Sequence, residues 1–256
     1  TGTQNTFVGA SAGDATTTAS NNTALGYAAL GANTTGASNV AVGHNAGANS
    51  TTASHNTSIG VNALNVNTTG AQNVAVGFQA LFRNTTATNN VAVGYNTLDH
   101  NTTGHSNTAI GQNAGDAITT GDQNVAVGFE ALVANTTGGS NVAVGRRSLD
   151  DNTTGGSNVS VGNESLRSNT TASNNTGIGH NALGANTTGG QNVAVGSNAL
   201  DANTTANNNT AVGHGSLSAN TTGTENTAVG AEALRDSTTG NYNIAVGKHA
   251  LKLNTE

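Results

Sequence analysis

The side chains in this sequence that could act as metal ligands or acid–base catalysts are seven histidines and thirteen acidic residues. They are scattered, and only His44, His180 and His214 recur at one position of the repeat described below. One set of aspartates is interpreted as a solvated corner: Asp99, Asp150, Asp151 and Asp201. The chain has no cysteine to supply thiolate ligands, and we predict no helix to complete a glycine-rich phosphate loop. We therefore expect no catalytic site, no metal site, no cofactor and no enzymatic activity.

Two recurring polar motifs are compatible with modification or ligand binding. The tripeptide Asn-Thr-Thr matches the N-glycosylation acceptor, and the alternative is a turn built from turn-favouring residues. The glycosylation candidates are Asn33, Asn67, Asn84, Asn101, Asn135, Asn152, Asn169, Asn186, Asn203 and Asn220. The paired threonines could form the ladders that ice-binding solenoids present. Those solenoids use Thr-x-Thr, however, whereas adjacent threonines should point to opposite sides of an extended chain.

The composition excludes several classes of partner. Only 8% of the residues are charged and the net charge is -6, which does not provide a basic surface for nucleic-acid phosphates. No apolar run is long enough to span a membrane, and the lack of cysteine excludes disulfides. Neither an initiator methionine nor a signal peptide is present, so we expect a mature, processed or excerpted chain.

A repeat of 17 residues occupies the whole sequence. Each copy is anchored on one glycine, and positions are counted from it. The 15 anchors are Gly9, Gly26, Gly43, Gly60, Gly77, Gly94, Gly111, Gly128, Gly145, Gly162, Gly179, Gly196, Gly213, Gly230 and Gly247. A fixed short period without insertions is typical of stacked repeats. We predict an all-β parallel β-solenoid (β-roll) of 15 coils, as one repeat domain over residues 1–256 without internal boundary or terminal caps.

The segment Asn-Val-Ala-Val-Gly predicts a strand that ends at the anchor. Positions −3 and −1 carry Val, Ile, Leu or Thr and are expected to face the core, with the usual Ala at −2 facing outward beneath a close neighbour. The usual Leu at +4 is expected to form the second wall of the core. In three copies +4 is glycine and +7 changes with it, so these positions are expected to touch: Gly13 with Thr16, Gly47 with Ser50, and Gly115 with Ile118.

Two further columns are candidates for ladders or contacts. Asparagine occupies −4 in every copy and predicts a structural ladder, represented by Asn73, Asn90, Asn107, Asn124 and Asn141. Position +1 carries a loose aromatic stripe in the first half: Tyr27, His44, Phe78, Tyr95 and Phe129. This stripe is interpreted either as packing beneath neighbouring loops or as a lateral contact or carbohydrate-stacking surface.

A spacing of ~4.8 Å per coil predicts a rod about 70 Å long. The chain begins and ends at the same position of the repeat, and its first and last coils are expected to have unpaired strand edges. Such edges favour end-to-end stacking unless caps lie outside this chain.

The recurring segment Asn-[Thr/Val]-Ala-Val-Gly-x-x-Ala, for example at residues 73–80 and 192–199, resembles the head repeat of trimeric autotransporter adhesins, roughly Asn-Ser-Val-Ala-Ile-Gly-x-x-Ala. It is also similar to repeats of phage tail-fibre shafts. The resemblance implies a left-handed β-roll, three subunits along a shared axis, and adhesion to host surfaces or matrix. This chain departs from the family in its longer unit and its Asn-Thr-Thr-Gly corner, and it shows neither a coiled-coil stalk nor a membrane anchor.

We therefore expect an extracellular or cell-surface structural and adhesive rod, a segment of an adhesin or fibre that presents repetitive edges. Its expected partners are further copies of itself, as a homotrimer or an end-to-end filament, and a surface receptor, matrix component or glycan. A self-stacking, glycosylated filament subunit and an ice- or carbohydrate-binding solenoid are the alternatives. No nucleic-acid partner is expected, and no membrane span in this chain.

Overall fold

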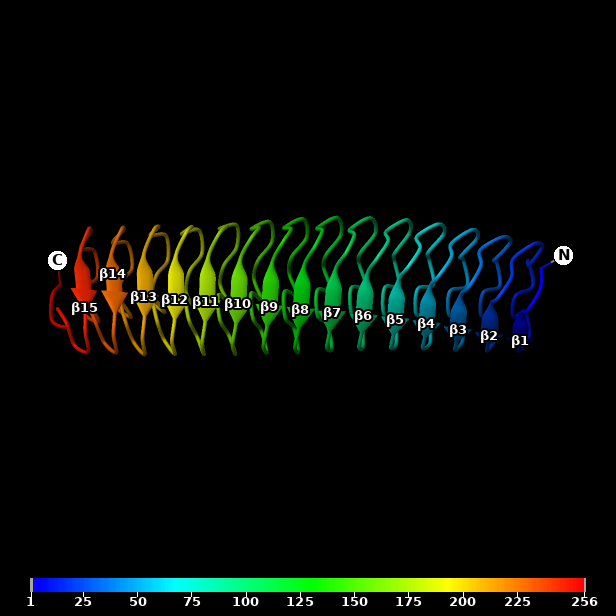
Figure 1. Cartoon of the computed structure of the whole chain (residues 1–256), viewed down its shortest axis with the longest axis horizontal. Helices are drawn as coiled ribbons and strands as arrows, with labels where there is room; N and C mark the ends of the chain where they lie inside the picture. Colours follow the sequence, from blue (N-terminus) through cyan, green and yellow to red (C-terminus); the bar gives the residue numbers. More distant parts are fainter. Residues whose placement is uncertain (1, 256) are drawn as a thin grey trace. The chain divides into compact units, whose positions relative to one another are not determined.

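The computed structural model describes residues 2–255, which contain fifteen short β-strands and no helix. The strands are β1 (Thr6–Val8), β2 (Thr23–Leu25), β3 (Val40–Val42), β4 (Thr57–Ile59), β5 (Val74–Val76), β6 (Val91–Val93), β7 (Thr108–Ile110), β8 (Val125–Val127), β9 (Val142–Val144), β10 (Val159–Val161), β11 (Thr176–Ile178), β12 (Val193–Val195), β13 (Thr210–Val212), β14 (Thr227–Val229) and β15 (Ile244–Val246). They are parallel, and their order in the sheet is their order in the chain (Figure 1). The predicted all-β parallel β-solenoid with 17 residues per coil is confirmed, whereas the left-handed coiling of the solenoid stays a prediction.

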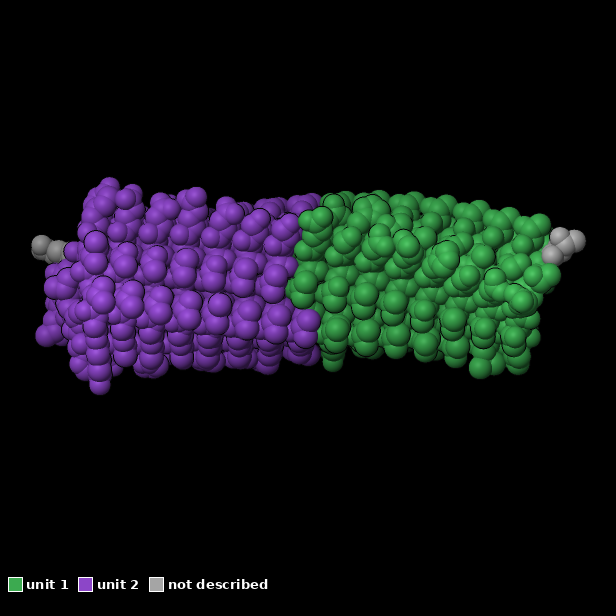
Figure 2. All heavy atoms as spheres, viewed as in Figure 1, with its two compact units in different colours: residues 1–126 green, residues 127–256 purple. Residues whose placement is uncertain are grey.

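The chain divides into two compact units, residues 1–126 (unit 1) and residues 127–256 (unit 2), as Figure 2 shows. In unit 1, strands β1 to β7 pair in register with their neighbours, for example Val74 with Val91. In unit 2, strands β9 to β15 pair in the same way, for example Val142 with Val159. Paired residues occupy the same repeat position, so side chains of one column form the regular rows visible on each unit. The single uninterrupted domain stays a prediction.

The expected orientation of the strands is wrong. In β9 the central Ala143 is 0% exposed and faces the core, whereas Val142 and Val144 lie half-buried on the outside. The same pattern of a buried central residue between two more exposed ones recurs in the strands of both units, for example in β5 and β12. The inward column is therefore alanine, and the larger β-branched side chains form the outer surface.

The narrowness of the coil explains this reversal. The side of the strand that faces inward lies directly against the segment that follows the anchor of the preceding coil. At Gly177, which takes the central place in β11, an added Cβ would lie 3.2 Å from Cγ of Leu166 and 2.7 Å from Oγ of Ser165. A side chain larger than methyl has little room there, because protein interiors are close-packed. The Leu column at +4 is buried, as predicted, from Leu30 to Leu234, whereas Leu251 is 50% exposed.

The irregular copies are compensated within the core. Phe7 replaces the central alanine of β1, and its ring occupies the space beside Gly13, where an added Cβ would lie 2.5 Å from Cε2. At Gly115 an added Cβ would lie 3.1 Å from Cδ1 of Ile118, so the isoleucine fills the volume that leucine fills elsewhere. The predicted contact between positions +4 and +7 is confirmed for this pair.

The anchor glycine is required by both conformation and packing. Gly145 has φ of 131°, a region that side chains strongly disfavour. A Cβ at Gly145 would also lie 2.5 Å from the carbonyl oxygen of Gly162 in the next coil. Contacts between successive anchors therefore leave no room for a methyl group from Gly9 to Gly230, and at Gly247 the positive φ alone favours glycine.

Side chains extend the hydrogen bonding between coils. The backbone N–H of Asn73 donates to Oδ1 of Asn56 at 2.8 Å, and Nδ2 of Asn73 donates to the carbonyl of Ala87 at 2.9 Å. The predicted asparagine ladder thus includes the backbone, with equivalent bonds at Asn90, Asn107 and Asn124. Each amide serves as both donor and acceptor in a buried position, which accounts for the occurrence of asparagine in every copy.

Candidate interaction surfaces and side-chain clusters

One face of each unit is formed by the outward residues of the strands, positions −3 and −1, which we call the outward strand surface. Every residue in these two columns is Val, Ile, Leu or Thr, and none is charged. Large side chains among them are exposed inside both units, including Ile110 at 41% and Ile178 at 39%. Contiguous exposed apolar surface of this kind marks an interaction site on a soluble protein.

The predicted aromatic stripe lies on the surface of the coils and is not covered by loops. Tyr27, Phe78 and Tyr95 in unit 1, and Phe129 in unit 2, are exposed, as is His44. Two pairs of rings from adjacent coils stack on each other: Tyr27 with His44, and Phe78 with Tyr95, each with centroids 5.3 Å apart. Within each pair, one ring face is already covered by its partner, which leaves less ring surface for a sugar to stack on.

The asparagines of the Asn-Thr-Thr corners are interior residues. All ten glycosylation candidates are buried; Nδ2 of Asn152, for example, donates to Oδ1 of Asn135 and to the carbonyl of Gly155, both at 2.9 Å. A glycan on Nδ2 would have to leave the coil and break these bonds. The geometry therefore favours the alternative interpretation, in which Asn-Thr-Thr-Gly is a corner built around a hydrogen-bonded asparagine.

The two corner threonines have different environments, as expected for adjacent residues. Oγ1 of Thr34 donates to the carbonyl of Thr51 in the next coil at 3.0 Å, whereas Thr35 is exposed. The bond of the first threonine recurs from coil to coil and accounts for threonine at this position in all copies. The second threonine forms one exposed column, narrower than the paired columns that a Thr-x-Thr face would supply.

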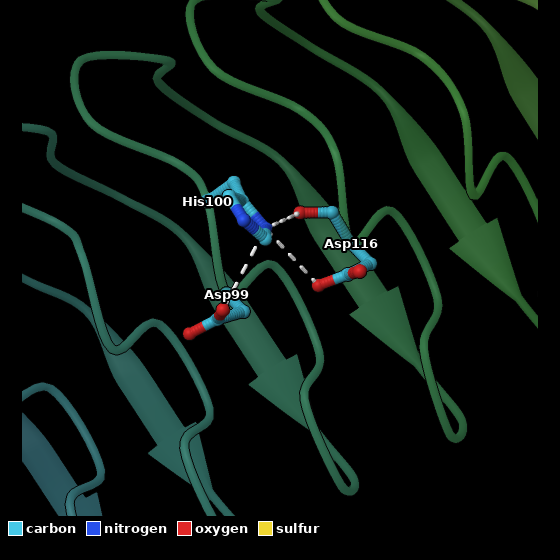
Figure 3. Close-up of side chains that lie close together, drawn as sticks. All are labelled: Asp99, His100 and Asp116. Carbon is cyan, nitrogen blue, oxygen red and sulfur yellow. Dashed lines mark hydrogen bonds and ion pairs between the residues drawn. The ribbon is translucent and has the colours of Figure 1, made fainter.

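A cluster that the sequence did not predict lies in unit 1, where Asp99, His100 and Asp116 converge (Figure 3). His100 Nδ1 lies 3.6 Å from Oδ2 of Asp99 and 3.4 Å from Oδ1 of Asp116. Burial raises the pKa of the Asp99 carboxyl, and nearby His100 and Arg83 partly oppose this shift. The sequence feature that could have predicted this cluster is an aspartate at +5 in two successive copies, with a histidine next to the first aspartate.

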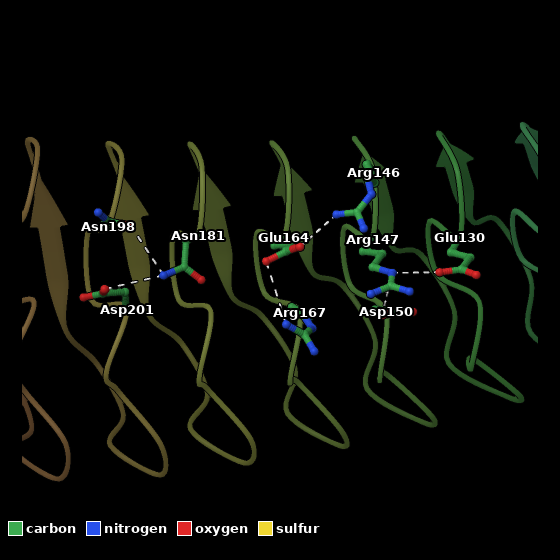
Figure 4. A network of polar contacts seen from close by, with 9 residues as sticks. All are labelled: Glu130, Arg146, Arg147, Asp150, Glu164, Arg167, Asn181, Asn198 and Asp201. Atoms are coloured by element: carbon green, nitrogen blue, oxygen red, sulfur yellow. Dashed lines mark hydrogen bonds and ion pairs between the residues drawn. The ribbon is translucent and has the colours of Figure 1, made fainter.

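The remaining aspartates do not form one solvated corner. Asp150 and Asp201 lie at position +5, as Asp99 does, and both are half-buried. Burial raises the pKa of each of these two carboxyls. Asp151, at +6, is exposed. In unit 2, Asp150 lies beside an ion-pair network in which Arg147 Nε contacts Glu130 at 2.7 Å and Asp150 at 4.0 Å (Figure 4). Such partly exposed pairs contribute little to stability individually.

Within residues 2–255, no helix has the length and apolar character needed to cross a membrane. Comparisons of the chain with protein-family models, with curated proteins and with solved structures found no match.

Proposed function

We propose that this chain is a non-enzymatic structural and adhesive segment of an extracellular or cell-surface fibre, which associates with further copies of itself through the outward strand surface. The observation that carries the proposal is the charge-free outward strand surface of each unit, in which position −1 is always Val, Ile or Leu and position −3 is Val, Ile or Thr. Burying such surface is the main favourable term in protein association.

The size of this surface supports association. Seven strands at ~4.8 Å spacing, each three residues or about 10 Å long, give a surface on the order of 340 Å² in one unit. That is comparable with the largest apolar patch of a typical monomer, about 300–600 Å², which is often functional. The uncharged columns also leave no ionic group to be desolvated when two copies meet.

The similarity of the repeat to adhesin heads is the reason for placing the proposed function at a cell surface. In this proposal, association holds the outward strand surfaces together and leaves the other edges of each coil, including the exposed threonine column, available to a receptor, matrix component or glycan. An end-to-end filament is the alternative assembly. Neither the glycosylated filament nor the ice-binding solenoid is favoured, because the corner asparagines are buried and the exposed threonines form a single column.

Mass in solution tests the assembly. Light scattering after size-exclusion chromatography should give about three chains, 3 × 25.0 kDa, for the wild type. A Val76→Lys/Val93→Lys variant places charges on the outward strand surface and should be monomeric. The matched control, Thr86→Lys/Thr103→Lys, places the same charges on the exposed threonine column of the same coils and should keep the wild-type mass.

A monomeric wild type, or a Val→Lys variant that keeps its mass, would contradict association through this surface. Circular dichroism of both variants verifies that the coils remain folded. Electron micrographs distinguish the alternative, because end-to-end stacking gives filaments of indefinite length whose assembly the Val→Lys substitutions leave intact.

A further inference from the structure

The Asp99, His100 and Asp116 cluster is not used by the proposed function. Asp99 and His100 follow β6, and Asp116 occupies the same column as Asp99 after β7. As Figure 3 shows, the imidazole lies between the two carboxylates. The three donor atoms lie within 4.8 Å of one another, and the backbone carbonyl oxygen of Asp116 lies 3.2 Å from His100 Nδ1.

The separations fit ligands around one small cation. His100 Nδ1 is 3.6 Å and 3.4 Å from the two carboxylate oxygens, which is longer than an ordinary N–H···O hydrogen bond of about 2.7–3.2 Å. Tetrahedral ligands at about 2.0–2.2 Å from a metal lie roughly 3.3–3.6 Å from one another. Both distances fall in that range.

The charges in the cluster also favour a cation. Asp99 is 8% exposed, and its Oδ2 faces His100, whereas its Oδ1, buried without a hydrogen-bond partner, points away from the imidazole (Figure 3). Arg83 lies 3.8 Å from the other oxygen of Asp99, but its side chain is half-exposed. Among the described residues, the ion pairs of Asp116 involve His100 alone. The two carboxylates thus occupy one column of adjacent coils, where Arg83 and His100 lie beside Asp99 and His100 lies beside Asp116.

The equivalent column in unit 2 differs at the second of the two coils. There the carboxylate of Asp150 lies 4.0 Å from Arg147 in the same coil, and the coil after β10 has Arg167 at the position of Asp116. An arginine therefore stands where the cluster in unit 1 has its second carboxylate, and Asp151 stands at the position of the imidazole. In unit 1 the position equivalent to Arg167 brings a second carboxylate to 3.4 Å from His100 Nδ1.

We propose that Asp99, His100 and Asp116 bind one divalent transition-metal cation, with Zn²⁺ the best match to a mixed imidazole and carboxylate donor set. The cation joins the coil after β6 to the coil after β7 and so cross-links two successive repeats. His100 ligates through the lone pair of neutral Nδ1.

Calorimetric titration of ZnCl₂ into the metal-free, untagged chain tests the proposal directly. The expected result is one Zn²⁺ per chain. Asp116→Asn and His100→Ala should each weaken binding at least tenfold, because each removes a ligand, whereas His180→Ala, which removes an exposed histidine without neighbouring carboxylates, should bind as the wild type does. Asp116 is partly exposed, so its substitution is not expected to disturb folding.

Two further readouts distinguish a bound cation from a stray surface contact. Co²⁺ should give the visible absorption bands of a low-symmetry site in the wild type, and these bands should be absent in Asp116→Asn. Hydrogen exchange of the His100 amide, which donates to the Asp116 carbonyl at 3.1 Å, should slow about elevenfold at free Zn²⁺ tenfold above its dissociation constant if the cross-linked coils must open for exchange. Absence of Zn²⁺ binding at millimolar concentration, or equal binding by the wild type and Asp116→Asn, would overturn the proposal.

Discussion

Gly145→Ala should destabilise its coil more than Gly247→Ala does, although both glycines have similar backbone conformations. Their φ angles are 131° and 123°, so the strain of placing alanine there, about 1–3 kcal/mol, is common to both variants. The two sites differ in packing. A Cβ at residue 145 would lie 2.5 Å from the Gly162 carbonyl oxygen, whereas nothing lies within 4 Å of a Cβ at residue 247.

The difference between the two variants follows from the hydrogen bonds beside the clash. Ordinary contact begins at 3.4 Å, so the coils must separate locally by 3.4 − 2.5 = 0.9 Å. The bonds from Gly162 N to Val144 O (2.8 Å) and from Glu164 N to Arg146 O (3.0 Å) would then exceed hydrogen-bond length. At about 0.5–1.5 kcal/mol each, their loss predicts an additional destabilisation of about 1–3 kcal/mol for Gly145→Ala.

Native-state hydrogen exchange measures this locally, which matters because repeat arrays do not always unfold in one step. The opening free energy of the amides of Gly162 and Glu164 is compared between wild type and Gly145→Ala. The opening free energy of the His249 amide is compared between wild type and Gly247→Ala. This amide donates to the Ala231 carbonyl at 3.0 Å. Equal losses in the two variants would mean that φ strain alone requires glycine, and the steric argument would be refuted.

Three further changes test the core and its charges. Ala143→Val should cost about 1–3 kcal/mol in urea denaturation because its site is fully packed, whereas Val144→Thr on the outward side should stay within about 0.5 kcal/mol; the reverse order would show that β9 faces the other way. Gly115→Leu and Ile118→Asn should each destabilise, since either alone leaves a clash or a void, but the double variant should recover about 0.5–3 kcal/mol as coupling energy; additive effects would refute the contact. Burial raises the pKa of Asp201, so the folded state favours the protonated carboxyl. The stability that this group contributes is therefore present below the pKa of the unfolded state and is lost as the pH rises through the pKa of the folded state. Asp201→Asn should therefore flatten the gain in melting temperature on acidification from neutral pH, and an unchanged pH profile would argue against this origin.

Much of the fold could be predicted because the repeat supplies internal comparisons. The invariant glycines and the covariation of Gly115 with Ile118 both report contacts that the structure contains. The orientation of the strands could not be obtained in this way. The usual expectation places the larger apolar side chains inward, but that expectation presumes a core wide enough to hold them. Here the distance between Leu166 and residue 177 limits the inward column to small residues.

The candidate sites were less predictable, for two physical reasons. Asparagine in Asn-Thr-Thr favours a turn whether its amide faces solvent or the interior, so the sequence does not distinguish a glycan acceptor from the buried Asn152. The cluster around His100 depends on which way the side chains at +5 and +6 turn after each strand. Register alone brings Asp99 and Asp116 into one column, but only the coil geometry brings the imidazole between them.

The inter-coil bonds have a consequence for how such a chain changes during evolution. From Asn73 to Asn56, and from Thr34 to Thr51, they join residues whose numbers differ by 17. Unequal recombination that adds or removes whole repeats creates a new junction with the same partners on either side. Loss of a single codon within a strand or corner would instead exchange inward and outward columns for part of a coil. Selection should therefore tolerate alleles that differ by complete units and remove those with intermediate lengths.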